Sequence, residues 1–163
     1  MSRFVATVFG IGDFPWAPGT LASMVAIVVA LVAYGVGGLG GYLAVLGTVL
    51  IAGFIVTHRT AGAFDQADPP EVVIDEVAGQ LIALTPLPLG LWIRGSDETL
   101  LPWPGIVTAF LAFRLFDIVK PWPVSWADRM KSPSGIMLDD VLAGLLAAVC
   151  VAGLGYFVHQ QLQ

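Results

Sequence analysis

Long apolar runs separated by short polar stretches dominate this chain. No charged residue occurs between Asp13 and His58, an interval long enough for two membrane-spanning helices of about 17–25 residues each. The glycine-rich stretch 35–41 divides this interval and suits a tight turn. The pattern therefore predicts a helix over 20–34, a hairpin at 35–41 and a second helix over 41–58.

Three further apolar runs follow the first two. The third covers 75–93, where Pro86 and Pro88 predict a kink or an early break. The fourth covers 105–119 and the fifth begins near Met137 and ends near Val158. We therefore expect an all-α integral membrane protein, with about five transmembrane helices in one bundle and a single domain over 1–163.

The N-terminal 19 residues are too short and too broken to cross a bilayer. Their apolar positions predict a short amphipathic or re-entrant segment, which leaves open whether it enters the bilayer. A glycine- and proline-rich loop over 10–19 follows, and Thr20 is the expected N-cap of the next helix.

Composition supports a membrane protein and excludes several other classes. Hydrophobic residues make up 57% of the chain and charged residues 12%, with a mean hydropathy of +0.86. Soluble domains carry about 25% charged residues, so the composition argues against a soluble domain, which would have too few polar residues to cover its core. The net charge of −5 argues against nucleic-acid binding. Cys150, the single cysteine, cannot form an internal disulfide or a cysteine-based zinc site.

The basic residues indicate the orientation in the membrane. Five crossings place the two termini on opposite sides. One side then carries Arg94 alone, and the other carries Arg3, Arg59, Lys120, Arg129 and Lys131. Because cytoplasmic loops are enriched in lysine and arginine, we expect the second side to face the cytoplasm.

Four polar groups fall on that same predicted face. Arg114, Asp117 and Lys120 are three residues apart, so they share one face of a helix. The other groups are Asp13 with its glycine loop, the pair Asp75 and Glu76, and the pair Asp139 and Asp140. The convergence of four polar groups on one face predicts a single site.

The excess of carboxylates predicts a cation. These acids cannot all ionise close to lipid without one, and hard oxygen ligands select Mg²⁺, Ca²⁺ or Mn²⁺. A Mg²⁺ site shared with a substrate phosphate is the inference that follows. Arg114 and Lys120 would bind the phosphate oxygens. Gly12 and Thr20 are further substrate-binding candidates, because glycine N–H groups before a helix N-terminus form an anion cradle.

Other interpretations remain open from these residues alone. Arg114 and Asp117 could form a structural i,i+3 pair, and acids at helix N-termini often only complement the helix dipole. A cation or proton transporter would also use membrane carboxylates, but it predicts acids spread through the membrane depth. A non-catalytic membrane subunit is a further alternative. The sequence leaves the oligomeric state open, with a homo-oligomer as one option.

Four blocks of this sequence resemble the phosphatidylglycerophosphatase A family, in the family's order and over nearly the whole chain. They are GDFPWAPGT (12–20), IDEVAGQ (74–80), FRLFDIVKPWP (113–123) and GIMLDDVLAG (135–144). The spaced acidic pattern of the CDP-alcohol phosphotransferases, another Mg²⁺-dependent family, is missing.

The resemblance implies a Mg²⁺-dependent lipid phosphatase of the bacterial inner membrane, with its site facing the cytoplasm. It implies conversion of phosphatidylglycerol phosphate to phosphatidylglycerol and phosphate, with another lipid phosphate as the alternative substrate. The implied acidic site residues are Asp75, Glu76, Asp139 and Asp140, which we take as the metal ligands. Asp117 or Glu76 is the candidate general base. Direct attack by water is favoured over a covalent route through Asp75 or Asp139, which stays open.

Overall fold

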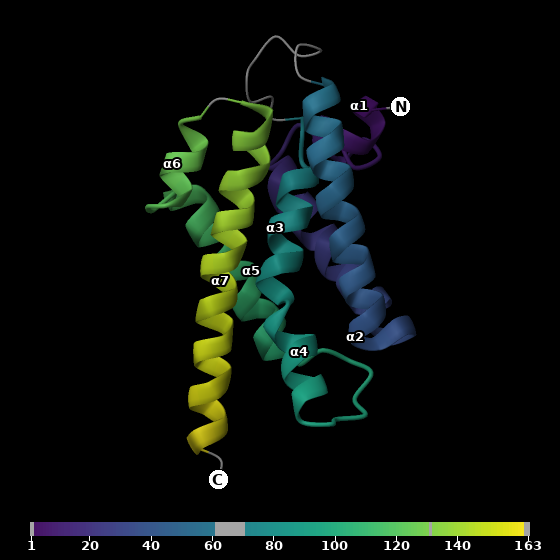
Figure 1. The fold of residues 1–163 in the computed structure, drawn as a ribbon, viewed down its shortest axis with the longest axis vertical. Coiled ribbons are helices and arrows are strands. Elements are labelled where there is room, and N and C mark those ends of the chain that lie inside the picture. Colours follow the sequence, from purple (N-terminus) through teal and green to yellow (C-terminus); the bar gives the residue numbers. More distant parts are fainter. Residues whose placement is uncertain (1, 61–70, 131, 162–163) are drawn as a thin grey trace.

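The computed structural model describes residues 2–60, 71–130 and 132–161, and every regular element in these ranges is helical. Figure 1 shows a bundle elongated along one axis, with the N- and C-termini at opposite ends. The elements are α1 (Ser2–Ala6), the short 3₁₀ helix η1 (Ile11–Asp13), α2 (Pro18–Thr60), α3 (Ile74–Leu84), α4 (Pro86–Ile93), α5 (Trp103–Val119), α6 (Val124–Asp128) and α7 (Pro133–Gln161). The expectation of an all-α protein is confirmed.

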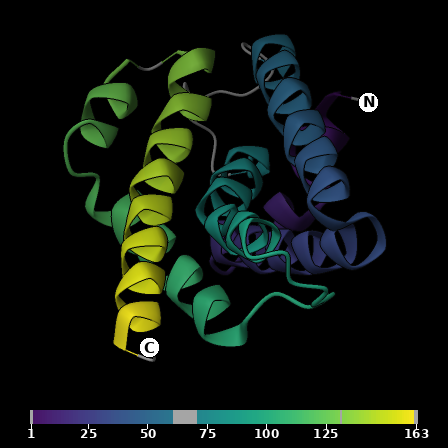
Figure 2. The ribbon, with the colours of Figure 1, turned by 60° about the horizontal axis from the view of Figure 1, so that its bottom comes forward.

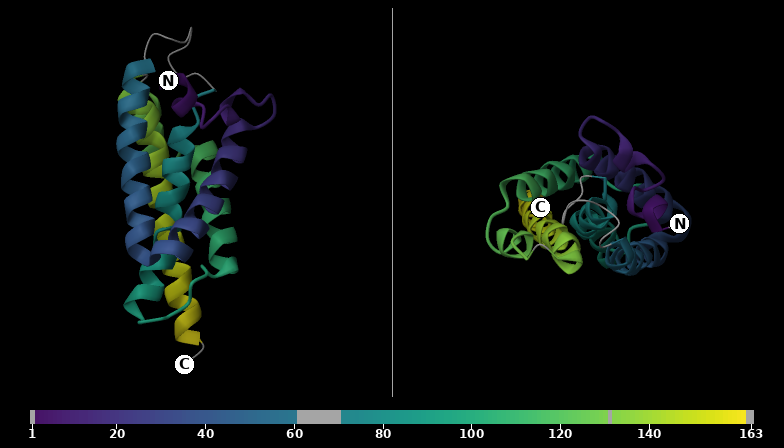
Figure 3. Two further views of the ribbon diagram at one scale, coloured as in Figure 1. Left: turned by 90° about the vertical axis from the view of Figure 1, so that its right-hand side faces the viewer. Right: turned by 90° about the horizontal axis from the view of Figure 1, so that it is seen from above.

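The long helix α2 folds back on itself at a glycine. Gly38 has φ 56° and ψ −151°, a conformation outside the helical region that glycine adopts without a Cβ penalty. The two arms of α2 run in opposite directions from this point (Figures 1 and 3). The predicted hairpin therefore exists, but as a break at one residue in place of a loop over 35–41.

Three helical segments are long and apolar enough to cross a membrane. They are Pro18–Arg59, Ile74–Ile93 and Pro133–Val158. Large apolar side chains such as Val32, Ile51 and Val149 are exposed on the outside of the bundle. Such a surface suits contact with lipid, where an apolar exterior carries no cost.

Helix α3 forms the centre of the bundle. Every residue of α3 except Glu76 is buried, and α2, α5 and α7 surround it (Figure 2). Two glycines allow the closest of these contacts. A Cβ added at Gly144 of α7 would overlap the carbonyl oxygen of Gly79, and one added at Gly79 would lie 2.7 Å from the Asp140 carbonyl oxygen. The α3–α7 pair thus depends on small residues, as is common for helices in membranes.

The predicted break at Pro86 is present, and Tyr42 compensates for it. Pro86 lacks an N–H, and the Thr85 N–H turns to the Ile82 carbonyl at 3.1 Å, which leaves the Leu81 carbonyl without its helical donor. The Tyr42 hydroxyl and the Thr85 hydroxyl both donate to that carbonyl. The freed backbone group is therefore satisfied inside the bundle, as a lipid surrounding requires.

Two helix starts and one additional short helix differ from the sequence prediction. Helix α2 begins at Pro18, so Thr20 lies inside its first turn and its assignment as N-cap is wrong. Helix α7 begins at Pro133, four residues before the predicted start at Met137. At this start the Ser132 hydroxyl accepts the Gly135 N–H at 3.1 Å. Proline at the first helical position explains both starts, because its fixed φ suits a helix that needs no N–H there. The short α6 lies in a segment that was predicted to be a loop.

Candidate functional site

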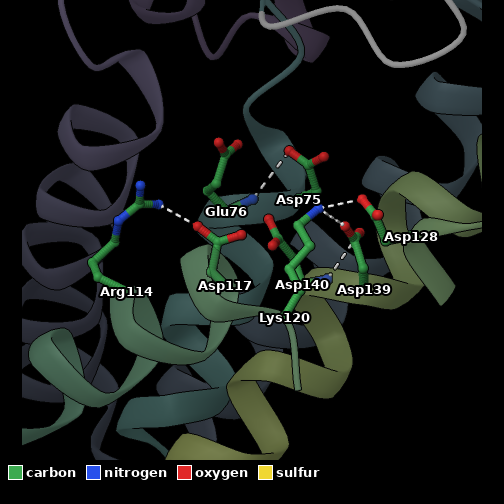
Figure 4. Close-up of polar contacts among 8 residues, drawn as sticks. All are labelled: Asp75, Glu76, Arg114, Asp117, Lys120, Asp128, Asp139 and Asp140. Carbon is green, nitrogen blue, oxygen red and sulfur yellow. Dashed lines mark hydrogen bonds and ion pairs between the residues drawn. The ribbon is translucent and has the colours of Figure 1, made fainter. Parts of the chain in front are cut away.

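Three carboxylates converge between α3 and α7. One oxygen each from Asp75, Glu76 and Asp140 lies within 4.8 Å of the others, and we call these residues the carboxylate triad. Asp75 is only 6% exposed and Asp140 only 4%. The acidic pair that begins α3 therefore meets an acid from the second turn of α7, as Figure 4 shows. The predicted convergence of these two acidic pairs is present.

The two acidic pairs have the same local geometry. Asp75 Oδ1 accepts the Glu76 N–H at 3.1 Å, and Asp139 Oδ1 accepts the Asp140 N–H at 3.0 Å. In each pair, one carboxylate oxygen of the first acid thus accepts a hydrogen bond from the backbone N–H of the second. In α3 this satisfies a donor of the first turn, which has no partner within the helix.

Arg114 and Asp117 form an ion pair at the edge of the triad. Arg114 Nη1 lies 2.7 Å from Asp117 Oδ2, and Asp117 in turn neighbours Asp140. The i,i+3 spacing on α5 explains the pair. Asp117 therefore lies between the Arg114 guanidinium and the carboxylate triad, and its side chain remains 16% exposed.

The first turn of α2 closes this side of the site. A Cβ added at Gly19 would overlap Glu76 Oε1 and lie 3.3 Å from Arg114 Nη1. A larger residue at this position would require the Glu76 side chain to shift. The structure therefore brings the end of the glycine loop, with the half-buried Thr20 beside it, against Arg114 of α5.

Lys120 is held by two acids outside the triad. It ends α5 in the left-handed conformation, with φ 47°, and its Nζ donates to Asp128 and, at 2.8 Å, to Asp139. Burial lowers the pKa of Lys120, but the hydrogen bonds and charges of Asp128 and Asp139 outweigh it and raise the pKa above its ordinary value. Lys120 therefore stays positively charged beside the triad (Figure 4).

Asp128 is the site residue that sequence reasoning missed. It lies at the end of α6, where the sequence predicted only a polar loop. Pro121 and Pro123 end the helix between Lys120 and Asp128, so only the turn between α5 and α6 brings these two residues together. Asp139, by contrast, was predicted as a metal ligand. Among the described residues no Asp139 oxygen belongs to the triad, and its assignment as a ligand stays a prediction.

Gly12 and Asp13 have different surroundings from the triad. A Cβ added at the buried Gly12 would overlap the Glu71 carbonyl oxygen, so Gly12 packs against the segment that precedes α3. The Val73 N–H also donates to the Ala6 carbonyl at 3.0 Å. The N-terminal segment thus braces the start of α3, while Asp13 is exposed. Substrate binding by Gly12 stays a prediction.

The triad fits a hard divalent cation. Three like charges in a buried space repel one another strongly, and oxygen ligands alone are what Mg²⁺, Ca²⁺ and Mn²⁺ prefer. Glu76 Oε2 is buried and has no hydrogen-bond partner among the described residues. A bound cation would balance these charges and give that oxygen a partner.

A separate pocket of about 400 Å³ lies between the N-terminal loop and α2. Its lining is apolar, with Ile11, Phe14 and Leu21 among the residues that form it. No member of the carboxylate triad lines it, so the ionic chemistry belongs to the triad and not to this pocket.

Comparison with known families identifies the chain. The model of the family described as PgpA, phosphatidylglycerophosphatase A, matches residues 4–155. The chain belongs to this family. A phosphatidylglycerophosphatase A of Haemophilus influenzae is 30% identical over 157 residues, which cover 96% of this chain and 90% of the relative. One of Escherichia coli is 33% identical over 158 residues, covering 96% and 82% respectively.

A further relative carries a different name. A Bacteroides thetaiotaomicron protein, provisionally named a phosphatidylinositol-3-phosphatase, is 33% identical over 156 residues, or 91% of this chain and 89% of the relative. No solved structure matches the chain. The relatives of this chain therefore carry names that specify different lipid monoesters.

Proposed function

We propose that this protein hydrolyses phosphatidylglycerol phosphate to phosphatidylglycerol and phosphate, with Mg²⁺ as its cofactor. The family match over residues 4–155 carries the proposal, and the family's members are named as phosphoric monoester hydrolases. The carboxylate triad beside Arg114 supports it, because a phosphate monoester needs cationic partners for its oxygens.

Asp75, Glu76 and Asp140 would hold the cation, with Asp139 as the further ligand that the sequence predicts. A Mg²⁺ ion in this place supplies charge neutralisation for the phosphoryl oxygens and lowers the pKa of a bound water. The protein's own contribution is to fix the carboxylates at the junction of α3 and α7.

Three groups around the triad would bind the phosphate. Arg114 offers a planar fork of donors, and Lys120 offers a point charge. The N–H groups of Gly19 and Thr20 lie in the first turn of α2, where a helix leaves its donors without internal partners. Together these groups would stabilise the negative charge that spreads over the transferring phosphoryl group.

Asp117 is the general base that the geometry favours over Glu76. It lies outside the triad, it neighbours Asp140, and its ion pair with Arg114 fixes its position beside the triad. The water oxygen forms a bond to phosphorus, and the bond from phosphorus to the glycerol oxygen breaks. Asp117 takes the proton of the water, and the leaving oxygen takes up a proton from solvent.

The membrane arrangement follows from the helices. We propose five crossings: two arms of α2, the broken α3–α4 segment, α5 and α7. Helix α5 has 17 residues and spans about 26 Å at 1.5 Å per residue, close to the hydrocarbon thickness. The basic residues Arg59, Lys120 and Arg129 then share the end of the bundle that carries the triad. That end would face the cytoplasm from the bacterial inner membrane.

The second candidate is hydrolysis of another phospholipid monoester. The name of the Bacteroides thetaiotaomicron relative favours it, because that protein is 33% identical to this chain. Both candidates use the same triad and cationic groups, so they differ in the alcohol attached to the phosphate.

A panel of substrates separates the two candidates. The purified protein would be offered phosphatidylglycerol phosphate, phosphatidylinositol 3-phosphate and phosphatidic acid in mixed micelles with Mg²⁺, and released phosphate would be measured. We expect the highest kcat/KM on phosphatidylglycerol phosphate. A higher value on phosphatidylinositol 3-phosphate would replace the first proposal with the second, and release from none of them would reject both.

A further inference from the structure

Gln80 is a buried polar residue that has no partner in the bundle. Its side chain is fully buried on α3, and neither its Nε2 nor its Oε1 forms a hydrogen bond to any described residue. Two other buried polar side chains are paired: the Ser23 hydroxyl donates to the Gly19 carbonyl at 2.9 Å, and the Tyr42 hydroxyl donates to the Leu81 carbonyl. An unpaired amide inside a membrane bundle is costly, which suggests that a partner arrives with a ligand.

The position of Gln80 points to that partner. Gln80 follows Glu76 by four residues on α3, so the two side chains share one face of the helix. Side chains on a helix lean toward its N-terminus, which directs Gln80 back toward the level of Glu76. Glu76 Oε2 is also buried and unpartnered. One turn of α3 therefore presents an unused donor and an unused acceptor on the same face.

We propose that Gln80 is a positioning residue for the cation site, whose Nε2 group donates to the Glu76 carboxylate when the triad holds a cation. This inference rests on the metal-binding part of the proposed function. Metal-binding carboxylates are commonly held in place by hydrogen bonds from a second layer of residues. Gln80 then makes this hydrogen bond in the protein that holds a cation.

The test measures cation binding directly in the purified full-length protein. Gln80→Met keeps the length and flexibility of the side chain but removes its hydrogen bonds. Mn²⁺ binding would be followed by electron paramagnetic resonance, since Mn²⁺ accepts the same oxygen ligands as Mg²⁺. We expect Gln80→Met to bind Mn²⁺ about 10–100-fold more weakly than the original protein. Its Tm without metal should stay unchanged or rise, because no hydrogen bond is lost in that state.

Tyr42→Phe is the matched control, because it removes a buried hydrogen bond elsewhere in the bundle. It should lower the metal-free Tm and leave Mn²⁺ affinity unchanged. Activity gives a further readout: the kcat of Gln80→Met should largely recover at saturating Mg²⁺, since Gln80 acts through cation affinity.

Three results would overturn the inference. Equal Mn²⁺ affinity in Gln80→Met and the original protein would reject the positioning role alone. If the metal-free Tm falls as far in Gln80→Met as in Tyr42→Phe, the Gln80 side chain makes a structural hydrogen bond in the metal-free protein, and the positioning role is rejected. If the original protein binds no Mn²⁺, the metal-binding part of the proposed function fails together with the inference.

Discussion

At the scale of single residues, the central feature is the convergence of three acids, two of them buried, beside one ion pair. Asp140 belongs to the triad through α7 and also neighbours Asp117 of α5. It thus connects the group proposed to hold the cation with the group proposed to accept a proton. Substitutions at Asp140 and Asp117 should separate these two roles.

Asp140→Asn should raise the Tm of the metal-free protein and shrink the further rise in Tm that Mg²⁺ produces. The substitution removes one of three like charges, which relieves repulsion, and it also removes one oxygen ligand of the cation. Thermal unfolding in detergent with and without Mg²⁺ measures both effects. Asp97→Asn, at an exposed position outside the triad, is the control and should change neither value. An equal Mg²⁺ response in Asp140→Asn and the original protein would contradict the assignment.

Asp117→Asn should lower kcat by about 10²–10⁴-fold, the usual contribution of a general base, and leave Mn²⁺ affinity nearly unchanged. The reason is that Asp117 lies outside the triad, so the cation keeps its three carboxylates. Steady-state phosphate release and Mn²⁺ binding on the same preparation are the measurements. Loss of Mn²⁺ binding in this variant would make Asp117 a ligand and return the role of base to Glu76.

At the scale of helices, close contact between α3 and α7 positions the triad. Gly79 and Gly144 allow the contact, since a Cβ on Gly144 would overlap the Gly79 carbonyl oxygen. The glycines could be recognised in the sequence as sites of close approach, because small residues let helices pack closely and Gly79 and Gly144 lie about one helical turn after the acidic pairs. The break at Pro86 was equally predictable, since proline cannot continue the hydrogen bonding of a helix. The compensating contact from Tyr42 was not, because it joins residues 39 positions apart.

Gly144→Val should destabilise the protein by about 1–3 kcal/mol, the usual cost of overpacking a tight contact, and should weaken Mn²⁺ binding. The added side chain would push α7 away from α3 and separate Asp140 from Asp75. Gly153→Val on the same helix is the control, because a Cβ there meets nothing within 4 Å. Unfolding in detergent compares the two variants. Equal stability and equal Mn²⁺ affinity in both would show that the glycine contact does not position the triad.

At the scale of the whole molecule, the apolar runs predict the bundle and its helices well, because lipid requires long uninterrupted helices. The acidic pairs could also be identified as site candidates, since charges in an apolar chain are costly. The same holds for the charged residues at the end of α5, which are Arg114, Asp117 and Lys120. The partners of Lys120 were not predictable. The sequence predicted a phosphate as the partner of Lys120, and the structure adds two acids, Asp128 and Asp139, which follow the turn into α6. Such contacts depend on how a connecting segment folds, and hydropathy carries no information about that.

The most direct test of the central claim is phosphate release from phosphatidylglycerol phosphate by the purified protein, measured in EDTA and again after Mg²⁺ is added back. The account predicts no release in EDTA, full recovery with Mg²⁺, and little recovery for Asp140→Asn at the same Mg²⁺ concentration. Release that persists in EDTA, or equal recovery in Asp140→Asn, would contradict a cation held by the carboxylate triad as the basis of the activity.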